Sequence, residues 1–545
     1  MKKLLLLLFV ALSFQAFSQK NYYWVKFKDK ENNSFSLSDP LQFLTQQSLD
    51  RRTKQGIELD STDLPITQSY IDAVTPFVGH LKHRLKWFNM LVVRIDSSVY
   101  VDSIRQLPFV EGINRIYYNP LAAKKDKFEY VTANPNQNYV YPNLYGQAYR
   151  QINMLNADLL HQLGHKGQGI LMTVLDNGFV NCPQITAFDS VRPRILKTWD
   201  FVNDEENVYN DGGHGLSCFS TIAANIPNHH VGTAPDASFV LCVTEDDNDE
   251  WVMEEYNWEA GAELADSLGA QLFSTSLGYT DFSTDSGNHT YADMNGNTTV
   301  ITRAANRAAS KGILVINSAG NEGANSWHYI AAPADGDSVI AVGAVDSAEV
   351  IASFSSRGPS YAGRVKPDLC AQGVKSAVIA TDGSLGYSGG TSFSCPTLAG
   401  CFASLWSAFP DKSAKDIYTA VVVSADRFWT PDSTYGYGIP NFYNAYLLLN
   451  TGYNANVLKT TGEVTAYPNP FADNLQLGIY NDEAGQHTIE LFDVSGRKVL
   501  SKQVFLRKKT FEIISLNEVN NLLPGEYLLK VDGKLKDTRQ LIKVK

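Results

Sequence analysis

The sequence of 545 residues lacks several features that mark particular classes of protein. None of its six cysteines belongs to a CxxC pair, which argues against a zinc site. Lys and Arg number 46 against 57 Asp and Glu, and the net charge of −11 argues against nucleic acid as the main partner. No run of 18 or more uninterrupted apolar residues occurs, so we expect no transmembrane anchor. Tandem repeats and coiled-coil heptads are also missing.

The first 18 residues have the three parts of a signal peptide. A positive start, Met1–Lys3, precedes the apolar run Leu4–Phe14, and small residues stand at the expected cut. The alternative, a buried strand, explains only the apolar run. The sequence therefore predicts export from the cytoplasm, where disulfides become available to the six cysteines. Six cysteines allow 15 pairings, and the sequence does not choose among them.

Residues 19–122 have the pattern of a small α+β unit. Strand-like and helix-like runs alternate along it, at 22–28, 41–54, 87–95, 98–107 and 112–118. We interpret this order as a ferredoxin-like β-α-β-β-α-β unit, with any small binding module as the alternative. Residues 123–145 are charged and then turn-rich, which predicts a linker that contains a processing site within reach of a protease.

The largest segment, residues 146–455, alternates apolar strand-like runs with helix-like runs. The expected strands are 170–175, 238–243, 272–276, 314–317 and 340–345, and the expected helices are 215–224, 255–268, 298–311, 396–409 and 413–424. Such alternation predicts an α/β fold with a mostly parallel sheet and helices on both faces. Active groups of such sheets lie at the carboxyl ends of the strands.

Residues 456–545 return to short alternating strands after the turn Tyr467-Pro468-Asn469-Pro470. This pattern predicts a small β-sandwich.

Charge is divided unevenly among the units. Residues 1–139 carry 18 Lys and Arg against 13 Asp and Glu, a net charge of +5, whereas residues 140–460 carry 16 against 33, a net charge of −17.

Three reactive side chains stand where strands or loops end in the acidic middle segment. Asp176 follows the apolar run 172–175, His214 stands between glycines before a helix, and Ser392 follows Gly389-Gly390-Thr391 before another helix. A catalytic triad needs a nucleophile, a base and an acid that orients the base. Each residue alone has an ordinary alternative: a turn for Asp176, a surface histidine for His214, and a helix N-cap for Ser392.

Asn321 adds a fourth candidate at the end of the apolar run 314–317. Its amide can donate a hydrogen bond to a developing oxyanion beside the backbone N–H of Ser392, and losing one such donor costs about 3–4 kcal/mol of barrier. The ordinary alternative is a polar Asn-Glu-Gly turn.

The order Asp, His, Asn, Ser with these flanking residues resembles the subtilisin-like serine peptidases, the subtilase family. The nucleophile segment Gly390-Thr391-Ser392-Phe393-Ser394-Cys395-Pro396 is similar to the family pattern Gly-Thr-Ser-Met-Ala-(Ser/Thr)-Pro. Two departures occur: Asn177 stands where the family has Ser or Thr, and Leu216-Ser217 follows His214-Gly215 in place of Thr-His. The similarity covers residues 146 to about 450.

The resemblance implies a subtilisin-like three-layer domain and a role for each candidate. Ser392 would attack a peptide carbonyl, His214 would carry the proton, Asp176 would orient His214, and Asn321 would stabilise the oxyanion. Residues expected to contact substrate are Ser276, Leu277, Gly278, Ala319 and Gly320, with 274–278 acting as an edge strand that pairs with an extended peptide. No cofactor is required and no catalytic metal is expected.

Two acidic clusters, at 200–211 and 246–255, leave two roles open. Carboxylate clusters bind calcium, as many subtilases do, although neither cluster has EF-hand spacing. Solvated charge, or attraction of basic substrates, is the other interpretation.

The flanking units gain roles from the same resemblance. Residues 19–122 are similar to the inhibitory propeptide of the family, and its positive charge suits the acidic middle segment. Residues 456–545 resemble the sorting domain that the type IX secretion machinery of Bacteroidetes recognises. The resulting hypothesis is a secreted or cell-surface serine endopeptidase made as a zymogen. The alternatives are a catalytically idle surface adhesin with the same fold, and a maturation protease that serves one client protein.

Overall fold

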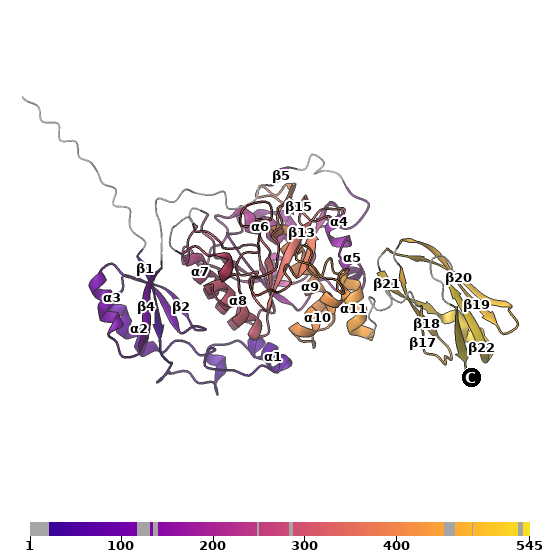
Figure 1. Cartoon of the computed structure of the whole chain (residues 1–545), viewed down its shortest axis with the longest axis horizontal. Helices are drawn as coiled ribbons and strands as arrows, with labels where there is room; N and C mark the ends of the chain where they lie inside the picture. Colours follow the sequence, from indigo (N-terminus) through magenta and orange to yellow (C-terminus); the bar gives the residue numbers. More distant parts are fainter. Residues whose placement is uncertain are drawn as a thin grey trace, which may run out of the picture.

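The computed structural model describes residues 21–116, 131–133, 140–247, 250–282, 287–451, 464–481, 483–508, 510–531 and 538–544. The predicted signal peptide lies outside the described residues, as does most of the predicted processing segment. Figure 1 shows three units along the long axis: a small N-terminal unit, a large central domain and a C-terminal β unit.

The central domain is built on a seven-stranded sheet in the order β14-β13-β12-β11-β6-β10-β7, and every neighbouring pair is parallel. The strands are β6 (Leu171–Asp176), β7 (Ile195–Asp200), β10 (Ser238–Val243), β11 (Leu272–Thr275), β12 (Leu314–Ser318), β13 (Val339–Val345) and β14 (Leu369–Gln372). The predicted α/β fold with a parallel sheet is confirmed. The two edge strands were missed, since β14 is short and β7 is only half-buried.

Helices cover both faces of this sheet and make the domain three-layered. They are α4 (Tyr149–Asn153), α5 (Ala157–Gln162), α6 (Gly213–Ala223), α7 (Met253–Leu268), α8 (Val300–Ser310), α9 (Thr391–Ala408), α10 (Ala414–Ser424) and α11 (Phe442–Thr451). Strand side chains alternate between the two apolar cores: Met172 and Val174 of β6 pack with α6 and α9, whereas Leu171 and Leu175 pack with α7 and α8. Both faces are buried, as parallel sheets require.

A small three-stranded sheet lies beside α6, and its strand β16 leads into α9. It joins β15 (Ser376–Ile379), β16 (Leu385–Ser388) and β5 (Thr132–Ala133), and β5 pairs antiparallel with β16. A second small ribbon pairs β8 (Asn225–Ile226) with β9 (His230–Val231). Part of the segment predicted as a linker is thus bound to the central domain.

The N-terminal unit has the predicted ferredoxin-like sheet, in the order β2-β3-β1-β4. Its elements are β1 (Tyr22–Phe27), α1 (Gln46–Gln55), α2 (Gln68–Val74), β2 (His80–Leu85), β3 (Met90–Arg94), α3 (Ser98–Arg105) and β4 (Val110–Ile116). The assignment of helix 41–54 to this fold was wrong. The first helix of the unit is α2, which has only two buried apolar side chains, whereas α1 lies apart from the sheet, under the central domain (Figure 1).

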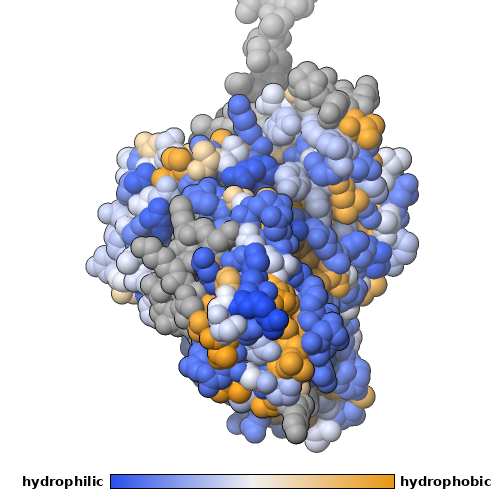
Figure 2. Space-filling model, turned by 90° about the vertical axis from the view of Figure 1, so that its right-hand side faces the viewer, coloured by the Kyte–Doolittle hydropathy of each residue, from blue (hydrophilic) through white to orange (hydrophobic). Residues whose placement is uncertain are grey.

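The C-terminal unit is the predicted β-sandwich. One sheet holds β17 (Thr465–Tyr467), β18 (Leu475–Asn481) and β21 (Thr510–Leu516), and the other holds β19 (Gly485–Asp493), β20 (Lys498–Leu506), β22 (Gly525–Val531) and β23 (Thr538–Lys543). It docks on α11, where Leu447 packs with Tyr480 and Phe511. Figure 2 looks onto this end of the molecule, where hydrophilic side chains alternate with apolar patches. Among the described residues, no helix is both long and apolar enough to cross a membrane.

Candidate active site

Asp176 and His214 form a buried pair at the carboxyl end of the sheet. Asp176 is the last residue of β6, and His214 is the second residue of α6. Nδ1 of His214 lies 2.7 Å from Oδ1 of Asp176, and both side chains are about 1% exposed. Gly215 allows this approach, because a Cβ atom there would lie 2.9 Å from the Cβ of Asp176. The carboxylate therefore fixes the orientation of the imidazole.

The contact with Asp176 also affects the protonation state of His214. Burial disfavours the imidazolium form, but the neighbouring Asp176 carboxylate and Cys218 together outweigh burial, so the pKa of His214 lies well above its ordinary value. Because a general base must be neutral, His214 is ready to accept a proton only at pH values above this raised pKa.

Asn177 is a positioning residue that the sequence did not single out. Its backbone N–H donates to Oδ1 of Asp176 over 2.8 Å, and its side-chain oxygen accepts from the N–H of Gly215 over 2.9 Å. Its Nδ2 donates to Asp247 over 2.7 Å. Through its backbone and side chain, Asn177 thus links Asp176 to α6 and to a neighbouring loop. The departure from the family's Ser or Thr was the available signal.

Ser392 lies in the first turn of α9 rather than before the helix. The helix begins at Thr391, five residues earlier than predicted, and Gly390 is its N-cap. The ordinary interpretation of Ser392 as the N-cap is therefore wrong. Backbone N–H groups of a first helical turn have no partner within the helix, so this turn can supply a donor to an oxyanion.

Cys218 places Ser392 beside the base. Its sulfur lies 3.7 Å from Nε2 of His214 and donates to the carbonyl oxygen of Ser392 over 3.2 Å. The ring of Phe393 stands 5.8 Å from the imidazole. Ser276 donates its hydroxyl to the same carbonyl over 2.8 Å. The acid, the base and the serine are thus gathered from three distant segments.

Asn321 is held against the first turn of α9 by Thr391. Its Oδ1 accepts from the backbone N–H of Thr391 over 2.9 Å and from the Thr391 hydroxyl over 3.0 Å. These two contacts fix the orientation of the amide and direct its Nδ2 donor to the opposite side.

The predicted substrate-contacting residues lie next to this turn. Ser276, Leu277 and Gly278 follow the carboxyl end of β11. The expectation of an edge strand at 274–278 was wrong, because β11 pairs with β6 and β12 on its two sides. The backbone of Ser274 and Thr275 is therefore committed to the sheet.

Ala319 and Gly320 follow β12 and pack around Ala331 together with Gly278. A Cβ atom on Gly278 would lie 2.9 Å from the methyl group of Ala331, and one on Gly320 would lie 3.7 Å from it. Ala331, which the sequence did not indicate, also donates its N–H to the carbonyl of Ala319 over 3.3 Å. Gly278 and Gly320 thus pack too closely against Ala331 and Ser356 to accept a larger residue at either position.

All six cysteines are buried and free of disulfides. Cys395, near the nucleophile, faces the carbonyl groups of Thr275 and Ile316, and burial raises the pKa of its thiol. Burial also raises the pKa of Cys218 to about 11. Asp176, His214 and Cys218 bring three metal-ligand atoms within 4.8 Å of one another, but a protonated thiol is a poor ligand.

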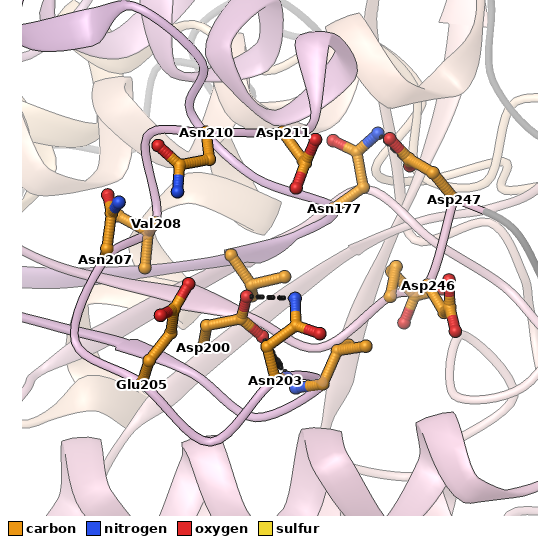
Figure 3. A pocket seen from close by; sticks show the side chains of 13 residues that line it. Asn177, Asp200, Asn203, Glu205, Asn207, Val208, Asn210, Asp211, Asp246 and Asp247 are labelled. Carbon is orange, nitrogen blue, oxygen red and sulfur yellow. Dashed lines mark hydrogen bonds between the residues drawn. The ribbon is translucent and has the colours of Figure 1, made fainter.

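The two acidic clusters meet in one pocket of about 250 Å³ (Figure 3). The end of β7 and the loop after it supply Asp200, Glu205 and Asp211, and the segment after β10 supplies Glu245, Asp246 and Asp247. Asn177 also lines the pocket, so the acidic pocket adjoins the Asp176–His214 pair.

The comparisons with known proteins agree with this geometry. Residues 167–438 match the Subtilase family, residues 22–132 match the Peptidase S8 propeptide domain of Bacteroidota, and residues 465–545 match the Secretion system C-terminal sorting domain. Subtilisin E from Bacillus subtilis is 31% identical over 307 residues, which covers 54% of this chain and 72% of that protein. The subtilisin of Bacillus pumilus is 32% identical over 265 residues, covering 48% and 84%. Serine protease AprX from Bacillus subtilis is 28% identical over 315 residues, covering 51% and 66%.

A parallel sheet that gathers an acid, a histidine and a serine at its carboxyl edge defines a class of serine hydrolases. The chain belongs to the subtilase family. It is a secreted or cell-surface serine endopeptidase with a propeptide and a type IX sorting domain. The predicted fold, reaction class and destination are confirmed, whereas the role of each site residue and the domain boundaries stay predictions.

Proposed function

We propose that Ser392 is the nucleophile of this endopeptidase, with His214 as general base, Asp176 as its orienting acid and Asn321 as oxyanion donor. The Ser392 hydroxyl oxygen attacks the peptide carbonyl while His214 accepts its proton. The Nδ2 group of Asn321 and the N–H of Ser392 stabilise the negative oxygen of the tetrahedral intermediate. His214 then returns the proton to the leaving amine, and water hydrolyses the acyl-enzyme by the same route.

The observation that carries this proposal is the buried contact of 2.7 Å between Asp176 and His214, with Ser392 linked to the same imidazole through Cys218. An idle adhesin would have no need for a buried acid–histidine pair, because isolated charge is costly to bury.

The test compares wild-type chain with Ser392→Ala for cleavage of casein and for removal of the propeptide. We expect loss of casein cleavage by about 10⁶-fold, together with loss of propeptide processing. Processing that persists while casein cleavage is lost would mean that another protease cuts the precursor. Casein cleavage that persists would favour the adhesin alternative with a contaminating activity.

Substrate is proposed to bind along Ser276–Gly278 and Ala319–Gly320, two segments that pack closely around Ala331. An extended peptide would pair with the backbone beyond β11. Ala331→Phe should raise KM for peptide substrates by about tenfold or more, because overpacking costs about 1–3 kcal/mol and the larger side chain would displace Gly278 and Gly320.

The acidic pocket is proposed to hold a structural calcium ion. Its donors are carboxylate and amide oxygens, the ligands that calcium prefers. The melting temperature of Ser392→Ala chain should rise by several degrees in millimolar calcium and fall with chelator, because a ligand at 100-fold its Kd stabilises by about 2.7 kcal/mol. Glu205→Gln should abolish this response. A pocket that instead receives basic substrate side chains would leave the melting temperature unchanged and would lower KM for basic peptides.

The partners proposed for this chain are polypeptide substrates, its own propeptide and the type IX secretion machinery. The propeptide would block the cleft until residues within 123–145 are cut, and the sandwich at 456–545 would be read during export. Deletion of residues 465–545 should keep the enzyme in the periplasm, which fractionation of the producing cells would detect.

A further inference from the structure

The polar helix α1 of the propeptide caps the carboxyl ends of α7 and α8. Helix ends leave backbone carbonyl groups without partners inside the helix. Here five carbonyls at or just beyond these ends, those of Asp266, Ser267, Ala270, Lys311 and Gly312, accept hydrogen bonds from Thr45, Ser48, Arg51 and Gln55. One short segment of the propeptide thus satisfies two helix ends of the central domain.

The spacing of these donors explains how one helix reaches both ends. Positions 45, 48, 51 and 55 are three or four apart and share one face of α1. Two glycines of the central domain allow the helix to approach: a Cβ on Gly269 would lie 2.7 Å from the backbone nitrogen of Ser48, and one on Gly312 would lie 2.9 Å from Ile57. The carboxyl ends of α7 and α8 are therefore shaped to receive α1.

A buried ion cluster closes the contact. Arg51 forms an ion pair with Asp266 of α7, and Arg52 bridges Asp266 and Asp63 at 2.9 and 2.8 Å. From the other side, Lys311 reaches Asp63 at 3.0 Å. These five side chains are at most 3% exposed. The propeptide and the central domain each contribute positive and negative side chains to this cluster. If the contact opens, buried charges on both surfaces lose their partners.

This contact adjoins the docking site of the ferredoxin-like sheet and extends it to the carboxyl end of α8. The sheet meets α7 one turn before Asp266, where Glu263 accepts from the backbone N–H groups of Lys86 and Trp87 at 2.9 and 2.7 Å, and Lys86 Nζ lies 3.9 Å from Asp266. Figure 1 shows α1 below α8 and α10, away from the sheet of its own unit. Gln55 also accepts from the N–H of Ala414 at the start of α10, over 3.0 Å.

We propose that residues 40–67, the clasp, form a second docking element that keeps the propeptide on the mature enzyme after the chain has been cut. Release then requires two contacts to open, and the sheet holds the clasp near its site at high effective concentration. The partner surface is the pair of α7 and α8 carboxyl ends, with Asp266 as its anchor for arginine. The proposal rests on the propeptide match and not on the assignment of Ser392.

The experiment uses the full chain with Ser392→Ala, so that no self-cleavage occurs. A recognition site for an added protease is inserted among residues 117–130, the chain is cut, and release of the propeptide is followed over time by gel filtration. The clasp variants are Arg51→Ala and the milder Gln55→Ala. Thr53→Ala, an exposed position on the same helix, is the matched control.

We expect the parent chain and Thr53→Ala to retain the cut propeptide equally. Arg51→Ala should release it about 100-fold faster or more, because removing one partner of a buried ion pair leaves an uncompensated charge. Gln55→Ala should release it about tenfold faster, since it loses only hydrogen bonds.

Equal release from the parent and from folded Arg51→Ala would overturn the proposal. If Arg51→Ala fails to fold, as judged by its unfolding transition before the cut, Gln55→Ala decides, because it leaves the ion cluster intact. A Gln55→Ala chain that releases no faster than Thr53→Ala would then count against the clasp. Both outcomes are independent of whether Ser392 is the nucleophile.

Discussion

Asp176 and Asp266 are both buried carboxylates of the central domain, but their surroundings differ. Asp176 is bound through Oδ1 to His214 and Asn177, and its Oδ2 has no hydrogen-bond partner among the residues that the structure describes. Asp266 uses both oxygens in ion pairs with arginines of the propeptide. Burial acts to raise the pKa of Asp266, but Arg51, Lys86 and Arg52 outweigh it and hold the pKa below its ordinary value.

This difference in bonding partners indicates a different role for each carboxylate. A fully paired buried carboxylate ties two elements together and loses most when one partner departs. A carboxylate that serves one imidazole leaves that imidazole free to gain and lose a proton, which catalysis requires. The two sites lie on opposite sides of the same sheet, so each can be broken separately.

The largest effect is expected at Asp176. Asp176→Asn should lower kcat by about 10⁴-fold, because the amide no longer stabilises the charged imidazole in the productive tautomer. The measurement is kcat on a chromogenic peptide, with enzyme concentration taken from folded protein. A loss below about tenfold would mean that Asp176 is not the orienting acid.

Asp266→Asn should lower stability rather than kcat, in contrast to Asp176→Asn. We expect it to lower the free energy of unfolding of the Ser392→Ala precursor by about 3–5 kcal/mol, because two arginines lose their buried partner. In the active chain, kcat per mature enzyme molecule should stay within about twofold of wild type. Urea unfolding and peptide kinetics measure the two quantities, and a kcat loss comparable to that of Asp176→Asn would erase the contrast.

Asn321 tests the active-site side without altering a charge. Asn321→Ala should lower kcat by about 10²–10³-fold with little change in KM, because its donor acts on the oxyanion rather than on bound substrate. A rise in KM of the same size, with kcat unchanged, would instead assign Asn321 to substrate binding. Thr391→Ser, which keeps the hydroxyl that contacts Asn321, is the matched control.

The smallest effect is expected in the pH dependence of kcat/KM, which further distinguishes the two carboxylates. Since Asp176 raises the pKa of His214, and only neutral His214 accepts a proton, kcat/KM should fall as pH decreases through a value above the ordinary pKa of histidine. In Asp176→Asn, the fall of the residual activity on the acid side should occur at lower pH than in the wild type. Coincident acid limbs in the two enzymes would show that Asp176 does not set this pKa.

Much of the central domain could be predicted from its sequence because the signals are local. The five central strands are apolar runs bounded by turns, and Asp176, Asn321 and their glycines follow such runs directly. The edge strands β7 and β14 carried weaker patterns. Helix α9 was predicted to start too late, because Pro396 resembles a helix start although it tolerates a place in the early turns of a helix.

Contacts between distant segments could not be predicted in the same way. The buried face of α1 holds Ser48, Arg51 and Arg52, which resembles a solvent-exposed face until Asp266, more than 200 residues away, is placed against it. The two acidic clusters were seen singly, and only the neighbouring positions of β7 and β10 bring them together. Asn177 was noted as a departure, but its three bonds depend on the packing of α6.

The most direct test of the catalytic assignment is labelling with a fluorophosphonate, which reacts only with an activated serine. After propeptide removal, peptide mass spectrometry should find the label on Ser392 alone, and Asp176→Asn or acidic pH should slow the reaction. Absence of label, or label on a serine other than Ser392 in folded, processed enzyme, would contradict the account.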